Sequence, residues 1–114
     1  MAFSIAFREA SGVTVLDLSG RITLGEGSAQ LRDAVRDLLG KGAKSILLNM
    51  ADVNYMDSSG LGELVSAFTA ARNQSAGLKL LNPSKKVSDL LQITKLYTVF
   101  DIHDDEAQAI ASYK

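Results

Sequence analysis

The sequence has 114 residues, with 12 basic and 13 acidic side chains and a formal net charge of −1. This length predicts one domain that spans residues 1–114, while the balanced charge argues against a nucleic-acid binder, and the lack of cysteine excludes disulfides and thiolate metal sites. Neither a membrane-spanning apolar stretch nor a secretory leader is visible in the sequence, so we expect a cytoplasmic protein that inserts into no membrane and binds no metal.

The N-terminal part of the sequence predicts an antiparallel hairpin. Apolar residues alternate with polar ones over residues 3–8, and a second β-rich run covers residues 13–18. Ser11-Gly12 breaks the pattern between the two runs, as a tight turn would, and Gly20 is expected to end the second strand.

A helix is predicted after the hairpin. Thr23 and Glu26 match a capping box, so the helix is expected to begin there. Gly40 to Gly42 supply its end. The apolar face is predicted from helical spacing at Leu31, Ala34, Val35, Leu38 and Leu39.

The middle of the sequence predicts a strand, a loop, a helix and another strand. Residues 45–50 form a short apolar run typical of a strand buried on both faces, and residues 51–57 are predicted to be a polar loop. A helix is expected from Ser58 to a stop at Gly77, followed by a strand over residues 78–81. The apolar face of the helix that begins at Ser58 is predicted at Leu61, Leu64, Val65, Phe68 and Ala71.

The C-terminal third predicts two more helices and a short edge strand. Asn82-Pro83 is expected to open a helix, residues 98–100 form the candidate edge strand, and residues 104–106 are acidic, as at a helix N-terminus. The buried sides of the two helices are predicted at Val87, Leu90 and Leu91, and at Ala107, Ile110 and Ala111. Strands that alternate with helices indicate an α/β fold, with a mixed four- or five-stranded sheet and helices mainly on one face.

The segment around residues 52–64 carries the most functional information. It lies where a buried parallel strand ends and a helix begins, which is where open α/β sheets gather functional groups. Asp57, Ser58 and Ser59 offer a carboxylate and two hydroxyls there, while Gly60 and Gly62 leave the backbone of the first helical turn accessible. A phosphoryl group on Ser58 would lie at the positive end of the helix dipole, and its charge would repel a docked partner. A simple helix cap is the alternative that the residue types leave open.

The string Asp57-Ser58-Ser59-Gly60-Leu61-Gly62 resembles the signature of the STAS domain family, the sulfate transporter and anti-sigma factor antagonist domains. Other features fall where that family has them, namely Gly20-Arg21-Ile22, the strand at residues 46–49, the strand at residues 78–81 before Pro83, and Leu90-Leu91 followed by Leu96 and Phe100. The resemblance covers nearly all of the chain and implies a single-domain STAS-like fold.

The resemblance also implies a function. Stand-alone members of similar size act as anti-sigma factor antagonists in bacterial partner switching: when unphosphorylated, they bind a serine-kinase anti-sigma factor that otherwise sequesters a sigma factor or another effector. The kinase phosphorylates the first serine of the pair, here Ser58, which releases the antagonist, and a phosphatase reverses the step. Such a domain catalyses no reaction, needs no cofactor, and is expected to be a monomer or weak dimer.

The expected partner surface follows from the same resemblance. It comprises the first turns of the helix that begins at Ser58, the exposed side of that helix, and the neighbouring loop at residues 23–27. Thr23 stands where many antagonists carry an aspartate near the phosphoserine, so the details of kinase docking are expected to differ. The partner-binding residues predicted are Asp57, Ser58, Ser59, Gly60, Leu61, Gly62 and Thr23.

Other functions fit fewer features of the sequence. Gly25-Glu26-Gly27 begins a phosphate-binding loop but has Gln30 where the third glycine would stand. His103 as a catalytic base would need Ser58 nearby and a third orienting group, and Ser58 lacks the flanking glycines of a nucleophile elbow. The alternatives that remain are a scaffold subunit of a signalling assembly, an accessory STAS subunit of a lipid transporter, and an enzyme.

Overall fold

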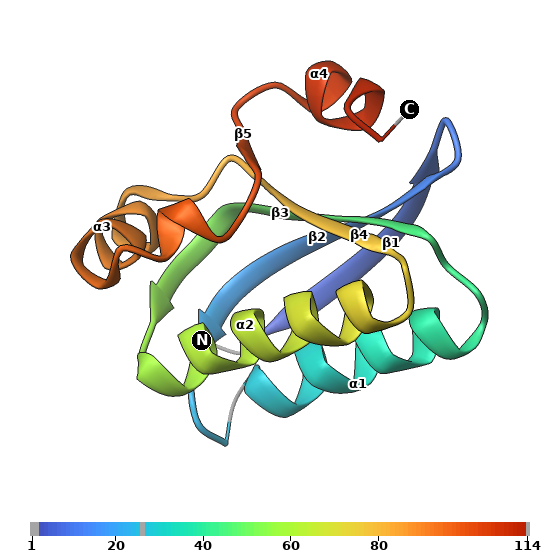
Figure 1. Ribbon diagram of the computed structural model, residues 1–114. Coiled ribbons are helices and arrows are strands. Elements are labelled where there is room, and N and C mark those ends of the chain that lie inside the picture. The colour runs from blue at the N-terminus through green and yellow to red at the C-terminus, as the bar shows by residue number, and fades with distance from the viewer. Residues whose placement is uncertain (1–2, 26, 114) are drawn as a thin grey trace.

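The chain begins with a hairpin of β1 (Ser4–Ala10) and β2 (Val13–Ile22) in the computed structural model, which describes residues 3–25 and 27–113 (Figure 1). Ser11 and Gly12 form the turn, with φ of 52° and 84°. Positive φ at both central residues is typical of the type I′ turn, whose twist matches that of the two strands it joins. The predicted hairpin is confirmed, although β2 continues past Gly20.

Five strands form one mixed sheet in the order β1-β2-β3-β4-β5. The pair β1–β2 is antiparallel, and the other neighbours are parallel. The remaining elements are α1 (Ser28–Gly40), β3 (Ser45–Met56), α2 (Ser58–Asn73), β4 (Gly77–Leu81), α3 (Lys85–Thr94), a 3₁₀ turn (Leu96–Thr98), β5 (Ile102–His103) and α4 (Glu106–Ala111). The predicted α/β class with a mixed sheet is confirmed.

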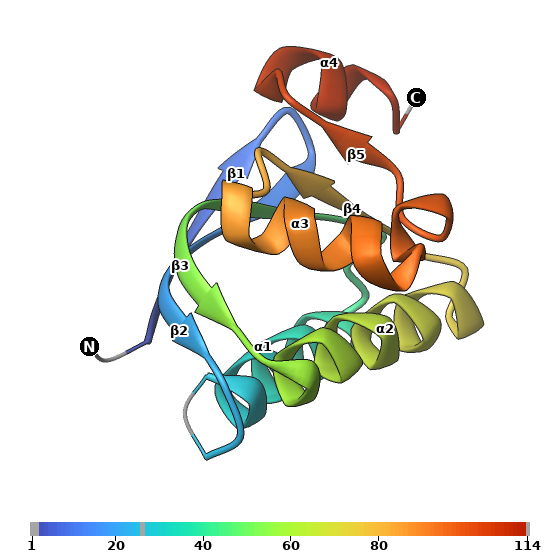
Figure 2. The ribbon, with the colours of Figure 1, turned by 90° about the vertical axis from the view of Figure 1, so that its left-hand side faces the viewer.

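The sheet carries a core on each face. Ile46 and Leu48 of β3 belong to a large core with α1, α2 and α3, whereas Leu47 between them belongs to a smaller core on the opposite face. All three side chains are fully buried, as predicted for a central strand. Figure 2 shows α1 and α2 side by side beneath the sheet and α4 apart from them. Three helices thus share one core and α4 packs on the other.

Residues 51–56 form the second half of β3, so the prediction of a loop there was wrong. This half of the strand pairs with the end of β2, up to the pair Ile22↔Met56. Val53 and Met56 are buried in the large core, while Asp52, Asn54 and Tyr55 are exposed. The sequence of this segment looks polar because the side chains on only one of its faces are buried. The residues that bury them come from a distant part of the chain.

Two predicted helix starts were also wrong. The N-cap of α1 is Gly27, whose N–H donates to Oε1 of Gln30 at 2.6 Å, and not Thr23; Glu26 of the predicted capping box lies outside the described residues. The N-cap of α3 is Ser84, which accepts a hydrogen bond from the N–H of Val87, and not Asn82. In both cases the better cap lies a few residues further along the chain.

The C-terminal elements differ from expectation in their limits. The edge strand is β5, not residues 98–100, and residues 96–98 form a 3₁₀ turn instead. Helix α4 begins after Asp105, whose side chain accepts a hydrogen bond from the N–H of Gln108, so the acidic start is confirmed. Its buried side consists of Ala109 with Ile110, because Ala107 and Ala111 face solvent.

An ion-pair network joins the two ends of the described chain. Arg8 of β1 contacts Asp17 at 2.7 Å and Glu106 at 2.6 Å. Hydrogen bonds from Arg8 lower the pKa of both carboxyl groups below their usual values. The network therefore connects α4 to β1, the edge strand at the opposite end of the sheet from β5.

We expect this network to make stability fall in acid. A carboxylate whose pKa is lower in the folded state contributes stability above its unfolded pKa, near 4, and loses it as the pH falls further. Because the side chains of Arg8, Asp17 and Glu106 are a third or more exposed, Arg8→Gln should cost less than about 1 kcal/mol at pH 7. Urea unfolding measures the free energy of unfolding at pH 7 and at pH 3. Between these two pH values it should fall less for Arg8→Gln than for the wild type, and an equal fall would contradict the assignment.

Candidate functional site

The candidate site lies at the junction of β3 and α2, where Asp57 is the single linking residue. Asp57 has an extended backbone and caps α2, since its Oδ1 accepts a hydrogen bond from the N–H of Gly60 at 2.9 Å. Oδ2 of Asp57 accepts a second bond from the N–H of Leu24 at 3.4 Å. A single carboxylate therefore holds the first turn of α2 and the β2–α1 loop together, as expected for a capping residue at a helix N-terminus.

Ser58 is exposed at the first position of α2. Backbone N–H groups of a first helical turn lack partners within the helix, and the helix dipole is positive there, so this position tolerates an added anion. Ser59 is half-buried, and its hydroxyl lies 3.4 Å from that of Ser28 at the start of α1. The two serines thus differ in environment, with the first open to solvent and the second turned toward α1.

Gly60 and Leu61 lie in the interior beneath this surface. A Cβ atom added to Gly60 would lie 2.2 Å from the carbonyl oxygen of Ile22, so α2 approaches the end of β2 too closely for any side chain. Leu61 is 7% exposed and belongs to the large core. Contact of these two residues with a partner stays a prediction, and their burial assigns them first to packing. Gly62, one residue further along, is exposed.

The β2–α1 loop lies beside the start of α2, where the N–H of Leu24 donates to Asp57. Thr23 is half-buried and forms an isolated bridge with Gly27 across the loop. Leu24 is 81% exposed, the largest value among the exposed large hydrophobic residues of the described chain. Leu24 was not among the residues predicted for the site, although an apolar residue between Thr23 and Gly25 in a turn-forming segment was a signal for it.

Charged and aromatic side chains border the site. The guanidinium of Arg21 lies 4.8 Å from the centre of the Tyr55 ring, and both residues are exposed at the ends of β2 and β3. Between the helices, Arg32 of α1 lies 3.7 Å from Glu63 of α2. Exposed aromatic and arginine side chains are the types enriched at protein interfaces. The border of the site therefore has the composition of a protein-binding surface.

His103 lies beside a carboxylate at the edge of the sheet. It lies in β5, next to β4, and its Nε2 is 3.1 Å from Oδ2 of Asp101. Lys79 lies 3.0 Å from the same carboxylate. Burial raises the pKa of Asp101, but hydrogen bonds from Lys79 and His103 outweigh it, and the net shift is downward. His103 therefore lies beside the ion pair of Lys79 and Asp101 at the sheet edge.

Two further observations concern other kinds of site. Within residues 3–25 and 27–113, three or more His, Asp or Glu side chains nowhere gather in a way that would hold a metal ion. Of the helices described, each is too short or too polar to cross a membrane.

Comparison with known proteins identifies the class. The STAS domain model matches residues 4–109, so the chain belongs to the STAS domain family. An anti-sigma-B factor antagonist from Bacillus subtilis is 39% identical over 72 residues, which are 63% of this chain and 65% of that protein. The matches cover about two thirds of the length of this relative and of one from Thermotoga neapolitana.

Solved structures show the same fold. A crystal structure of an anti-sigma factor antagonist from Mycobacterium paratuberculosis has a TM-score of 0.86 at 16% identity, and covers 97% of this chain and 93% of the other. The Bacillus cell fate determinant SpoIIAA in its phosphorylated form has a TM-score of 0.74 at 22% identity, with 97% and 100% coverage. At these identities the likeness concerns the fold.

Proposed function

We propose that this protein is an anti-sigma factor antagonist that is switched by phosphorylation of Ser58. In its unphosphorylated form it binds a serine-kinase anti-sigma factor, and phosphorylation of Ser58 by that kinase releases it. A phosphatase restores the binding form. The proposal is supported by the names of the relatives, anti-sigma-B factor antagonists among them, and by a structural neighbour that was solved in a phosphorylated form.

The observation that carries the proposal is the position of Ser58. Its side chain is exposed, it directly follows Asp57, the N-cap of α2, and it opens the first turn of this 16-residue helix. The carboxylate of Asp57 already accepts a hydrogen bond from the N–H of Gly60, so the start of the helix does not depend on the hydroxyl of Ser58. A phosphoryl group can therefore be added without removing the cap, and its charge of about −2 would change the surface rather than the fold.

The proposed partner surface surrounds Ser58. Asp57, Ser59 and Gly62 flank it on α2, and Thr23 lies in the loop that Asp57 holds in place. Gly60 and Leu61 support the surface from within. We assign the chain a regulatory binding role in the cytoplasm, where sigma factors act, and no catalytic step of its own.

We expect a single phosphorylation site. A pull-down with the wild-type domain should capture a serine kinase, and incubation with that kinase, ATP and Mg²⁺ should add one phosphate to Ser58, because this hydroxyl is the exposed one of the pair. Intact mass and fragmentation locate the phosphate. Ser59→Ala is the matched control and should still accept one phosphate, whereas Ser58→Ala should accept none. Phosphate on Ser59 with Ser58 unmodified would refute the assignment.

A further inference from the structure

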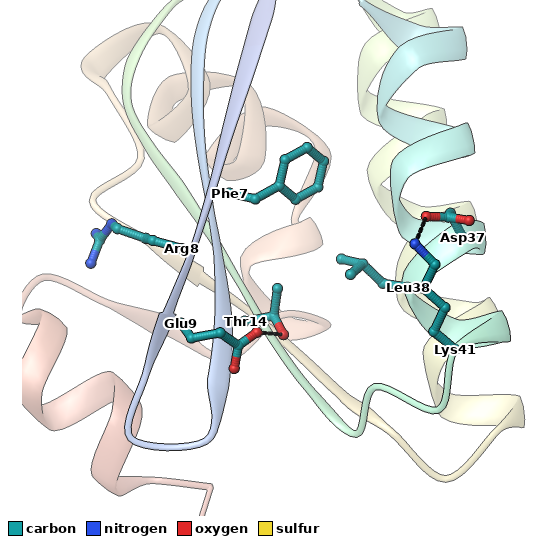
Figure 3. Close-up of a pocket in the computed structure, with 7 residues that line it drawn as sticks. All are labelled: Phe7, Arg8, Glu9, Thr14, Asp37, Leu38 and Lys41. Atoms are coloured by element: carbon teal, nitrogen blue, oxygen red, sulfur yellow. Dashed lines mark hydrogen bonds and ion pairs between the residues drawn. The ribbon is translucent and has the colours of Figure 1, made fainter.

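A cleft of about 360 Å³ lies between the free edge of β1 and the C-terminal half of α1 (Figure 3). In Figure 3, Phe7 points from β1 toward α1, and Leu38 points back toward the sheet. Phe7 is 57% exposed although it belongs to a strand. The residues that line the cleft are Phe7, Arg8, Glu9, Thr14, Asp37, Leu38 and Lys41. They come from β1, β2, α1 and its C-cap Lys41, and the proposed partner surface at Ser58 shares no residue with them.

The hairpin register determines which backbone groups of β1 are free. In a hairpin with a two-residue turn, the pair beside the turn exchanges both hydrogen bonds, and bonded pairs then alternate with non-bonded ones. Ala10↔Val13 is the pair beside the turn, so every second residue back from Ala10 is bonded to β2. Ile5, Phe7 and Glu9 therefore direct their N–H and C=O groups away from the sheet, toward the open edge.

The two charged side chains of β1 are engaged within the molecule. Edge strands usually avoid pairing with other chains because charged side chains stand along them. Here Arg8 is paired with Asp17 and Glu106 on the face of α4, and the carboxylate of Glu9 accepts a hydrogen bond from the hydroxyl of Thr14 at 2.6 Å. The open edge therefore presents an exposed phenylalanine and outward backbone groups, while Arg8 is held in ion pairs and Glu9 in a hydrogen bond on β2.

We infer that β1 is a homodimer interface, in which the β1 strands of two copies pair antiparallel across a twofold axis at Phe7. The outward backbone N–H and C=O groups of Phe7 form hydrogen bonds with those of Phe7 in the second copy. The backbone groups of Ile5 form hydrogen bonds with those of Glu9 in the second copy. All seven residues of the strand are then paired, and the two sheets become one continuous ten-stranded sheet. Each Phe7 ring covers the cleft of the other copy beside Leu38.

A second copy fits this edge because the pairing is self-complementary. On one face Glu9 lies opposite Ile5, and on the other Arg8 lies opposite Ala6, so like charges never face each other directly. A shift that centres the axis on Arg8 would place two arginines opposite each other, which destabilises a strand pair. The cleft itself carries both signs of charge, with Asp37 and Lys41 paired at 3.0 Å, and so favours no strongly acidic or basic peptide. Closed twofold contacts of this kind are the commonest form of assembly.

Sedimentation velocity over a concentration series tests the interface. The wild type should shift from the monomer mass of 12.2 kDa toward twice that value as its concentration rises. Phe7→Glu places two carboxylates opposite each other on the axis and should stay monomeric at concentrations where the wild type is mainly dimeric. Leu24→Glu is the matched control, since it changes another exposed apolar residue and should dimerise normally. A wild type that is monomeric at every concentration overturns the inference. A Phe7→Glu variant that dimerises as the wild type does also overturns it.

Cysteine pairing tests the register without changing Phe7. The chain has no cysteine, so Ile5→Cys and Glu9→Cys each introduce a single thiol. Paired residues of this type have Cα atoms about 5.5 Å apart, within the range of a disulfide. An oxidised mixture of the two variants should give several times more covalent dimer than either variant alone. Equal yields in all three samples would overturn the proposed register. Neither result depends on kinase binding, so this inference and the proposed function fail separately.

Discussion

Gly60→Ala should cost the domain at least about 3 kcal/mol of unfolding free energy, near or beyond the upper end of what overpacking a core costs. The new Cβ would lie 2.2 Å from the backbone oxygen of Ile22 and 2.9 Å from side-chain atoms of Ile22 and Met56. A backbone carbonyl in a sheet cannot move aside as the end of a flexible side chain can. Helix α2 would have to separate from the end of β2, which would also disturb the hydrogen bonds of Asp57.

Gly62→Ala provides the matched control for this prediction. It makes the same chemical change two residues further along the same helix, where an added Cβ meets no described atom within 4 Å. There the higher helix propensity of alanine should stabilise the domain by about 0.5–1 kcal/mol. Urea unfolding of both variants should therefore give changes of opposite sign. Two small changes of the same sign would show that α2 does not pack against β2 as described.

Ser58→Asp should fold normally and bind the kinase partner roughly 2–5 kcal/mol more weakly than Ser58→Ala, because an unmatched charge is buried in the interface. A carboxylate at the first position of a helix is favoured by about 0.3–1 kcal/mol, so the fold should survive the change. In the complex, however, the new charge would lie next to Asp57. Ser58→Ala loses a hydroxyl and adds no charge, so it should bind the partner while accepting no phosphate.

Titration calorimetry with the captured kinase measures these affinities. Ser75→Asp is the control for added charge, because Ser75 is an exposed serine beyond the C-terminal end of α2, outside the proposed partner surface. It should bind about as well as the wild type, and circular dichroism should show that all the variants are folded. Equal affinities for Ser58→Ala and Ser58→Asp would mean that charge at this position does not control association, and the phosphorylation switch would have to be abandoned.

The sequence predicts the elements of this fold better than their ends. Leu31, Val35 and Leu39 mark α1 because helical spacing is a local property, and all three are buried as expected. The start of α1 was misplaced because Thr23 offers a plausible cap, whereas the actual cap at Gly27 uses the side chain of Gln30. Local patterns can name several caps, and the tertiary structure selects among them.

The second half of β3 shows a different limit. Residues 51–56 look like a loop until β2 lies beside them, and the length of that pairing depends on irregularities near Gly20 in the partner strand. The position of Asp57 and Ser58 at a strand-to-helix junction was easier to predict, since the two residues lie together in the sequence, and their role stays a prediction. The hydrogen bond from Leu24 to Asp57 joins residues 33 positions apart in the sequence, which no periodic pattern reveals.

The late position of α4 in the chain has a consequence for synthesis on the ribosome. Val13, Val15 and Leu47 are made well before Ala109 and Tyr113, which pack against them on the second face of the sheet. Nascent chains that stop short of residue 105 therefore present an apolar strip along the sheet, which is the kind of surface that chaperones shield. The strip is closed once α4 has emerged, when the hydroxyl of Tyr113 donates to the carbonyl of Ile46 and Arg8 pairs with Glu106.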